Sequence, residues 1–541
     1  MSVSNLRWPL AGQSASDLLA RRRAVSRVLL VSISFLAIVT LVQRFDAPAV
    51  LVATLAVPTV LTLLLRPTIA IPATLFLVYV NVPAILTQQH GVPHLAAGAI
   101  ILLLAFPLFH ALLLRREPLR LDTTFFLMLG YLAVLVLTAF GVTGHREAFQ
   151  HIQKFLFEGI LLYWLLINVV RTRATLDSAI WTLLAAGMLL GALTTYQELT
   201  GSFSQEFGGL SRRNHEYLAL QHLDRDDPGH NERLQTFARS NSSGGRSSRA
   251  NGPMDEPNRY AQILIVILPL ALFTYRTRRS RWSGIIVAAA SGSILLGMIF
   301  SHSRGGFATL LGLALLTGAI GWVRRSYLIG GAVAVVLLVS LLGPRYVERI
   351  ASIATVSALF SDNGSANADG AIRGRATSML AAAQVFVDHP LRGVGPAQFA
   401  PYYSEEYSKK NPNFQFRDAR GSRRAHSLYF EIAAEGGVLG LASFVAIFAY
   451  LIHALNHERR RWARRRPDLA ELATAFFFSL LAYLGTGVFL HLSYQRYLWL
   501  LIGLAGAALH ILRTTEGEER LPRAGPRAGS HHIKASRADS G

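Results

Sequence analysis

Long apolar stretches alternate with polar segments over most of this chain. A helix needs about 20 mainly apolar residues to cross the hydrocarbon core of a bilayer, and scanning for such runs gives about fourteen. The pattern predicts an all-α, polytopic membrane protein. The predicted spans centre on residues 28–43, 48–65, 68–87, 95–114, 121–142, 154–170, 176–196, 259–275, 283–300, 305–323, 326–343, 428–454, 470–490 and 495–512.

The composition supports this class. Hydrophobic residues make up 52% of the 541 positions and charged residues 16%, whereas soluble domains carry roughly 25% charged residues. The mean hydropathy is +0.35. The chain has no cysteine, which excludes a disulfide framework and a thiolate metal site.

The net charge of +21 raises the question of nucleic-acid binding, but the distribution of arginines gives a different answer. If the N-terminus is cytoplasmic, the arginines fall in the inward loops and the short outward loops hold almost none, as the positive-inside rule requires. We therefore expect membrane lipid, and no nucleic acid, as a partner. The inward arginines are Arg66, Arg115, Arg116, Arg120, Arg171, Arg173, Arg276, Arg278, Arg279, Arg281, Arg324, Arg325 and the six from Arg459 to Arg466.

This topology divides the chain into seven parts. Arg21, Arg22 and Arg23 precede the first run, and no small-residue cleavage site follows it, so we expect a retained anchor. The predicted parts are a cytoplasmic N-terminus (1–27), N-terminal spans (28–196), a partly flexible outer loop (197–258), further spans (259–343), a large periplasmic loop (344–427), C-terminal spans (428–512) and a disordered cytoplasmic tail (513–541).

The large loop lies between the eleventh and twelfth predicted spans. Apolar residues recur at helical spacing over 346–360 and again over 372–387, and the second helix should end at His389-Pro390. Gly393 and Gly395 then mark a turn. The pattern predicts a helical periplasmic cap.

Candidate chemistry clusters at the outward ends of the predicted spans. Asn258 follows Pro257 where a span begins, so it serves either as a helix cap or as a substrate contact. Ser303, Arg304 and Gly305 lie between two spans with almost no loop. An arginine at membrane depth is costly, and it either snorkels to headgroups or binds a ligand that the small neighbouring residues admit.

The loop adds Arg373 and Arg375, whose paired donors suit phosphate oxygens, although a loop arginine is often only solvated. Arg424 and His426 then stand at the boundary of the next span. The pKa of an imidazole suits general base work, although a lone interfacial histidine is more often structural. Glu431 and Glu435 share a helix face, and Gly436-x-x-x-Gly440 permits close helix packing.

Four segments stand out within roughly residues 252–441. They are G-P-M-D-E-P-N-R-Y-A, S-H-S-R-G-G-F, R-A-T-S-M-L-A-A-A-Q-V-F-V-D-H-P-L-R-G-V-G-P-A-Q-F and A-H-S-L-Y-F-E-I-A-A-E-G-G-V-L-G-L. In this order they resemble the O-antigen ligase/polymerase superfamily, integral membrane glycosyltransferases of the bacterial envelope. The large outward loop comes before the last few spans, as in that family.

The resemblance implies a glycan donor on undecaprenyl diphosphate and an acceptor sugar hydroxyl at the periplasmic face of the bacterial inner membrane. Arg304 and Arg375 are then the cations for the diphosphate, and His426 is the base. Further substrate contacts are expected at Asn258, Ser303, Gly305, Arg373, Gly395, Arg424 and Glu435. No cofactor or metal is expected, because a diphosphate leaves readily and the outer loops show no acidic ligand cluster.

Three alternatives stay open. A polymerase would join lipid-linked repeats instead of transferring a glycan to lipid A-core or another glycoconjugate. A transporter or flippase would hold the same diphosphate, although transporters place their sites near the midplane. A non-catalytic scaffold of envelope assembly is the third, and it leaves His426 unexplained.

Overall fold

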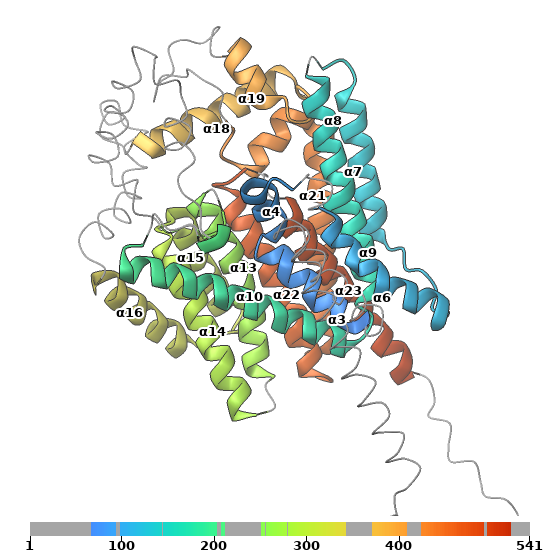
Figure 1. The fold of residues 1–541 in the computed structure, drawn as a ribbon, viewed down its shortest axis with the longest axis vertical. Coiled ribbons are helices and arrows are strands. Elements are labelled where there is room, and N and C mark those ends of the chain that lie inside the picture. Colours follow the sequence, from blue (N-terminus) through green and yellow to red (C-terminus); the bar gives the residue numbers. More distant parts are fainter. Residues whose placement is uncertain are drawn as a thin grey trace, which may run out of the picture. The chain divides into compact units, whose positions relative to one another are not determined.

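The computed structural model describes residues 67–92, 98–142, 144–202, 207–210, 250, 252–254, 256–277, 280–341, 370–407, 424–491 and 495–520. All regular secondary structure in these ranges is helical, as predicted (Figure 1). The predicted spans 28–43 and 48–65, the predicted helix 346–360 and most of the loop 197–258 lie outside the described residues.

The helices follow the predicted apolar runs closely. Their bounds are α3 Pro67–Tyr79, α4 Val82–His90, η1 Ala99–Leu104, α6 Ala105–Phe109, η2 His110–Leu114, α7 Thr123–Ala139, α8 His145–Lys154, η3 Phe155–Leu161, α9 Leu162–Val169, α10 Arg173–Thr200, η4 Phe207–Gly209, α13 Pro257–Arg276, α14 Arg281–Phe300, α15 Arg304–Ala319, α16 Arg325–Leu341, α18 Gly370–Asp388, α19 Phe399–Tyr402, η8 Tyr403–Tyr407, α21 Leu428–Trp462, α22 Pro467–Gly487 and α23 Gln495–Arg520.

Several of these helices are long enough to cross a membrane. In the described part of the chain, seven meet the length and hydropathy of a span: His145–Val169, Arg173–Thr200, Pro257–Arg276, Arg281–Phe300, Leu428–Trp462, Pro467–Gly487 and Arg496–Thr515. Shorter apolar helices occupy Ile69–Tyr79, Ile100–Leu114, Thr123–Ala139 and Arg304–Ala319. The chain is a multi-pass membrane protein, and the count of about fourteen spans stays a prediction.

One predicted span is interrupted. The run 68–87 forms α3 and α4, which meet at Asn81, a buried residue with a φ of 70°. Asn tolerates this left-handed backbone better than most residues, and Pro83 favours the start of a new helix. The Asn81 Nδ2 donates to the carbonyl of Pro253 at 2.8 Å, so the break connects α4 to the segment that leads into α13.

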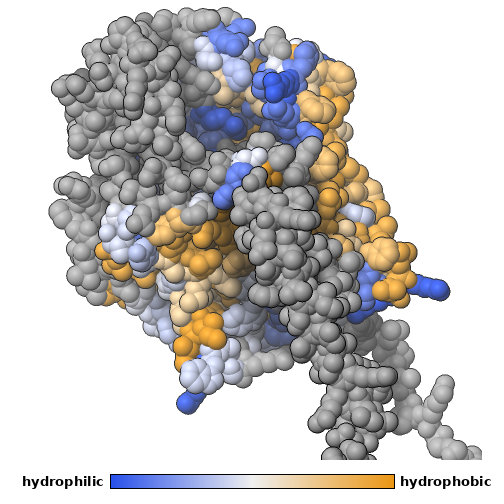
Figure 2. All heavy atoms as spheres, in the orientation of Figure 1, coloured by the Kyte–Doolittle hydropathy of each residue, from blue (hydrophilic) through white to orange (hydrophobic). Residues whose placement is uncertain are grey.

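The helical core is built around α13. This helix packs against α22 and α14, while α21 packs against α22 and α7, and α23 packs against α9. Large aromatic side chains fill the space between them, including Phe155, Phe444 and Trp499. In Figure 2, hydrophobic residues cover the side along α7, and hydrophilic residues gather near α18 and α19.

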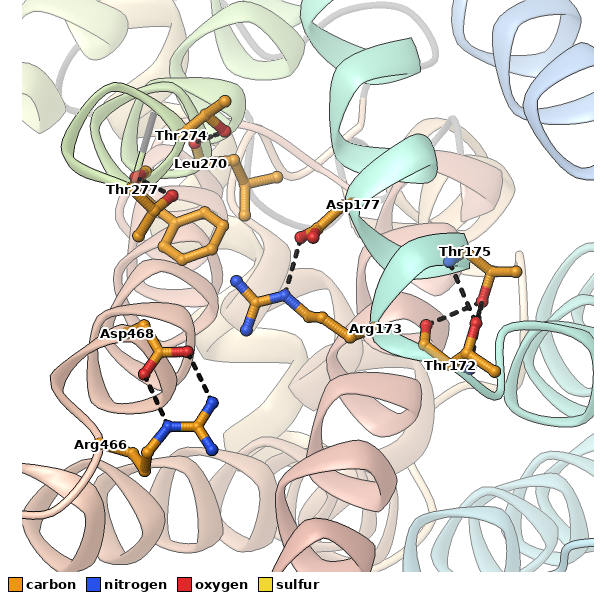
Figure 3. Close-up of polar contacts among 10 residues, drawn as sticks. Thr172, Arg173, Thr175, Asp177, Leu270, Thr274, Thr277, Arg466 and Asp468 are labelled. Atoms are coloured by element: carbon orange, nitrogen blue, oxygen red, sulfur yellow. Dashed lines mark hydrogen bonds and ion pairs between the residues drawn. The ribbon is translucent and has the colours of Figure 1, made fainter. Parts of the chain in front are cut away.

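Arginines that the sequence predicts to be cytoplasmic meet at one end of α10, α13 and α22 (Figure 3). The Arg173 Nε lies 2.8 Å from Asp177 Oδ1, and its guanidinium carbon is 5.2 Å from the centre of the Phe273 ring. The Arg466 Nε lies 3.1 Å from Asp468 Oδ1. The same helices lead, at their other ends, to the polar residues of the candidate site. Helix α13 has 20 residues, so it separates the two ends by about 30 Å, the thickness of the hydrocarbon core.

The large loop contributes α18, which packs against α21. Helix α18 ends at Asp388, so the predicted end before His389-Pro390 is confirmed. The predicted turn at Gly393 and Gly395 follows, and both glycines have positive φ. Helicity of this part of the loop is therefore confirmed, and its periplasmic location stays a prediction.

The turn docks into a break in α21. Gly437 has φ 61° and ψ −158°, a conformation that is accessible almost only to glycine. In a regular helix the amide of Val438 would donate to the carbonyl of Ala434. Here the Val438 amide donates to Pro390 at 2.7 Å, and the Val394 amide donates to Ala434 at 2.9 Å.

This break corrects the expectation of close helix packing through Gly436-x-x-x-Gly440. A Cβ on Gly436 would meet nothing within 4 Å, and a Cβ on Gly440 would meet only Ile432, which belongs to the same helix. Gly437 is the glycine that the fold requires, because a Cβ there would lie 2.4 Å from the carbonyl of Leu391.

Candidate functional site

The first turn of α13 supplies the first part of the site. Glu256 occupies the N-cap position and Pro257 follows it in the first turn, where the missing amide hydrogen breaks no helical bond. The Asn258 Nδ2 donates to Glu256 Oε1 at 3.0 Å, and the Arg259 Nε lies 3.2 Å from Glu256 Oε2. The interpretation of Asn258 as the helix cap is therefore wrong, because it lies inside the first turn and binds the capping residue.

Ser303 joins the second motif to the first. Its hydroxyl donates to Asn258 Oδ1 at 3.0 Å and accepts from the Gly306 amide at 3.2 Å, which caps α15. Arg304 is the first residue of α15 and is partly buried. A Cβ on Gly305 would lie 3.1 Å from the Cβ of Phe489, so the segment after α22 covers this turn closely.

His426 lies immediately before α21 with a φ of 53°. Its ring meets the ring of His491 edge to face, with centroids 5.7 Å apart and planes at 81°. The carbonyl of His491 accepts a hydrogen bond from Arg259 Nη1 at 3.1 Å. The histidine pair therefore connects the start of α21 to the start of α13.

Burial and nearby cations keep His426 neutral. Desolvation lowers the pKa of His426 below its usual value of 6.5, and the charge of Arg375 lowers it further, against the opposing effect of Glu256. The pKa of His491 lies well below the usual value because of burial and the charge of Arg259. Both imidazoles are therefore unprotonated at neutral pH, the state that accepts a proton.

The carboxyl of Glu256 is ionised in the same surroundings. Burial alone would raise its pKa, but the charge of Arg259 and the hydrogen bond from Asn258 outweigh that effect and lower it. Arg375 and His426 act on Glu256 in the same direction. These interactions bring Arg375, from α18, within electrostatic reach of α13 and of the start of α21.

Arg373 precedes Arg375 by two positions on α18. Its Nε is buried and has no hydrogen-bond partner in the described ranges. A buried guanidinium nitrogen without a partner is unfavourable, so this atom is available to a bound acceptor group.

Arg424 is held by a carboxylate of α21. Its guanidinium pairs with both oxygens of Glu431, and the Nε contact to Oε2 measures 3.2 Å. Burial disfavours the charge of Arg424, but the pairing with Glu431 outweighs it and raises the pKa of the arginine above its usual value. Arg424 therefore remains a fixed positive charge beside His426.

Gly395 and Glu435 have structural partners. The Gly395 amide donates to the Glu435 carbonyl at 2.9 Å, and the Phe399 amide lies 3.4 Å from Glu435 Oε1. These contacts hold the turn after α18 against α21. Substrate contacts at either residue stay a prediction.

The structure thus gathers residues from five segments of the chain. It joins Asn258 to Ser303 by a hydrogen bond, and it places His426 within reach of the charge of Arg375. The sequence prediction missed His491, Glu256 and Arg259 as site residues. Glu256 and Arg259 stand inside the first quoted motif, and His491 follows the apolar run 470–490 as His426 precedes the run 428–454. Within the described ranges no group of three His, Asp or Glu side chains could hold a metal ion.

The fold and this site define a class: a multi-pass, all-helical membrane protein with a buried, charged site at one end of its helices. The model of the family described as O-antigen ligase matches residues 289–445. This match supports the resemblance to the O-antigen ligase/polymerase superfamily over less than a third of the chain. The matched region contains Arg304, Arg375 and His426, whereas Asn258 and His491 lie outside it. No curated protein matches the chain.

Proposed function

We propose that this protein is a membrane glycosyltransferase that moves a glycan from undecaprenyl diphosphate to a sugar hydroxyl of an acceptor, as an O-antigen ligase does. The reaction takes place at the periplasmic face of a bacterial inner membrane. The observation that carries the proposal is the chain of contacts that joins His426 to Glu256 through His491 and Arg259: the two histidine rings lie 5.7 Å apart, the His491 carbonyl accepts from Arg259 at 3.1 Å, and Arg259 lies 3.2 Å from Glu256. The charge of Arg375 acts on His426 and Glu256 alike. This group lies at the end of the helices opposite the arginine pairs of Figure 3.

In the proposed reaction His426 accepts the proton of the acceptor hydroxyl while that oxygen attacks the anomeric carbon of the donor. The bond between this carbon and the diphosphate oxygen breaks, and the diphosphate leaves with the electron pair. Arg375 and Arg304 bind the diphosphate and stabilise its growing charge, because a guanidinium offers paired donors to phosphate oxygens. Such a base contributes about 10²–10⁴-fold to a rate.

The surrounding residues have supporting roles in this proposal. Arg373 and Arg424 add positive charge along the donor headgroup, and Asn258 and Ser303 position the first turns of α13 and α15. The absence of a side chain at Gly305 lets Phe489 pack directly beside the turn that carries Arg304. The reaction as written uses only groups of this chain and needs no metal ion, since a diphosphate is a good leaving group.

The position of the site favours transfer over transport. A transporter is expected to hold its substrate near the midplane on broken helices. Here the charged cluster lies at the first residues of α13, α15 and α21. A non-catalytic scaffold would not require a neutral histidine beside buried cations.

The choice between ligase and polymerase is tested with purified protein in lipid nanodiscs and a lipid-diphosphate-linked repeat. A ligase forms no product until an outer-core oligosaccharide acceptor is added. A ladder of longer lipid-linked products from the repeat alone would overturn the ligase assignment.

Arg375→Lys tests the proposed diphosphate contact in the same assay. This variant keeps the positive charge but loses the paired donors, so we expect transfer to fall by about tenfold or more.

A further inference from the structure

The segment 488–491, between α22 and α23, contacts three parts of the candidate site. The side chain of Phe489 covers Gly305, and the carbonyl of His491 accepts from Arg259 Nη1 at 3.1 Å. The ring of His491 lies against His426. This segment is fixed to α22, because the Phe489 amide donates to the Thr486 carbonyl at 3.0 Å.

The two histidine rings form a defined pair. Their planes are nearly perpendicular, at 81°, with centroids 5.7 Å apart, which is the edge-to-face arrangement that aromatic rings prefer. The Nδ1 atoms of both rings are buried and have no hydrogen-bond partner in the described part of the chain. The contact between the two rings, and not a hydrogen bond to Nδ1, is therefore the interaction available to orient the imidazole of His426.

His426 needs such support because of its backbone. A φ of 53° is unusual for a residue other than glycine, so the backbone of His426 is strained. The backbone fixes where the side chain starts, but rotation about its two side-chain bonds still decides where the imidazole nitrogens point. A packed ring on one side removes part of that freedom.

We propose that His491 is a positioning residue for His426: its ring holds the imidazole in the orientation that receives the acceptor proton. The inference rests on the proposed function. His491 does so as an uncharged ring, because a second cation beside His426 would oppose proton uptake. The carbonyl contact with Arg259 anchors His491 to the first turn of α13, so the position of His426 depends on three helices.

The kinetic test compares His491→Ala and His491→Phe in the full-length protein. Loss of the ring should reduce kcat by about ten- to a hundredfold, with the KM for the donor within about twofold of wild type, as misplacement of a reacting group by about 1 Å does. Phenylalanine keeps the ring contact and should restore kcat to within about threefold. His453→Ala, an exposed histidine far along α21, is the control.

Two kinetic outcomes would overturn the positioning role. Wild-type kcat in His491→Ala would mean that the ring is dispensable. A His491→Phe variant as slow as His491→Ala would mean that an imidazole nitrogen, and not the ring contact, is required.

A second readout is independent of glycan transfer. Diethyl pyrocarbonate modifies unprotonated histidines, and mass spectrometry of the peptide containing His426 gives its rate of modification. We expect this rate to rise several-fold in His491→Ala and to stay near wild type in His491→Phe. An unchanged rate in His491→Ala would contradict the ring contact. Absence of transfer in the wild type together with the expected change in reactivity would overturn the proposed function alone.

Discussion

Replacing Gly437 by alanine tests how the loop after α18 is held against α21. The Cβ of an alanine at this position would lie 2.4 Å from the carbonyl carbon and oxygen of Leu391 and 2.7 Å from the amide nitrogen of Arg392. All three are backbone atoms, so relief requires movement of the whole turn.

The expected cost follows from two effects. Alanine at φ 61° and ψ −158° adopts a conformation that is nearly exclusive to glycine, which costs about 1–3 kcal/mol. Overpacking against backbone adds about 1–3 kcal/mol. We expect Gly437→Ala to destabilise the fold by about 2–5 kcal/mol and to lose transfer activity, because the same turn carries α18 and therefore Arg375.

Thermal unfolding of the purified protein in detergent, followed by tryptophan fluorescence, measures the effect. Gly436→Ala is the matched control, since a Cβ there meets nothing within 4 Å and alanine favours a helix by up to about 1 kcal/mol. If both variants lowered the unfolding midpoint equally, close helix packing through Gly436 and Gly440 would be the better account, and the docking argument would be refuted.

Three further outcomes are expected. Because burial and Arg375 lower the pKa of His426, the transfer rate should stay constant as pH falls through 6.5 and decline only at more acidic pH. A pH–rate profile whose acidic limb has its midpoint at or above pH 6.5 would contradict a neutral, buried base. Ser303→Ala removes a cap and the bond to Asn258, so it should lower stability by about 1–2 kcal/mol in thermal unfolding, and an unchanged midpoint would argue against this link. Asn81→Leu leaves the Pro253 carbonyl without its donor, at a cost of about 1–3 kcal/mol in the free energy of unfolding. Asn81→Gly also removes the donor but tolerates the left-handed backbone, so it isolates the contribution of the hydrogen bond. Wild-type stability in Asn81→Gly would show that the hydrogen bond is dispensable.

The apolar runs predicted the helices well, because a helix that crosses lipid needs a long stretch of apolar residues. The residues that cap the helices are also close to them in sequence. Asp122, Thr172 and Ser280 each accept a hydrogen bond from an amide in the helix that they precede. The end of α18 could likewise be predicted from Pro390. The break at Asn81 had a local signal in Pro83, but the continuous hydropathy of the run concealed it.

The site was only partly predictable, because its members meet through contacts between distant segments. Motif order indicated His426 and Arg375, and their electrostatic proximity is a property of how α18 packs on α21. His491 had no motif around it, and its pairing with His426 depends on where α22 ends. Gly437 could not be distinguished from its neighbour Gly436, since the turn that approaches it comes from a segment about 45 residues away, a separation that local pattern rules do not cover.

The central claim is that His426 takes the acceptor proton in glycan transfer from a lipid diphosphate. The most direct test compares wild type and His426→Ala in nanodiscs with a labelled lipid-diphosphate glycan and an oligosaccharide acceptor, with donor binding and product measured in the same sample. The account predicts a new glycosidic product for the wild type, and for His426→Ala donor binding close to wild type with transfer reduced by about 10²-fold or more. Wild-type transfer by His426→Ala, or movement of the donor across the bilayer without any new glycosidic bond, would contradict it.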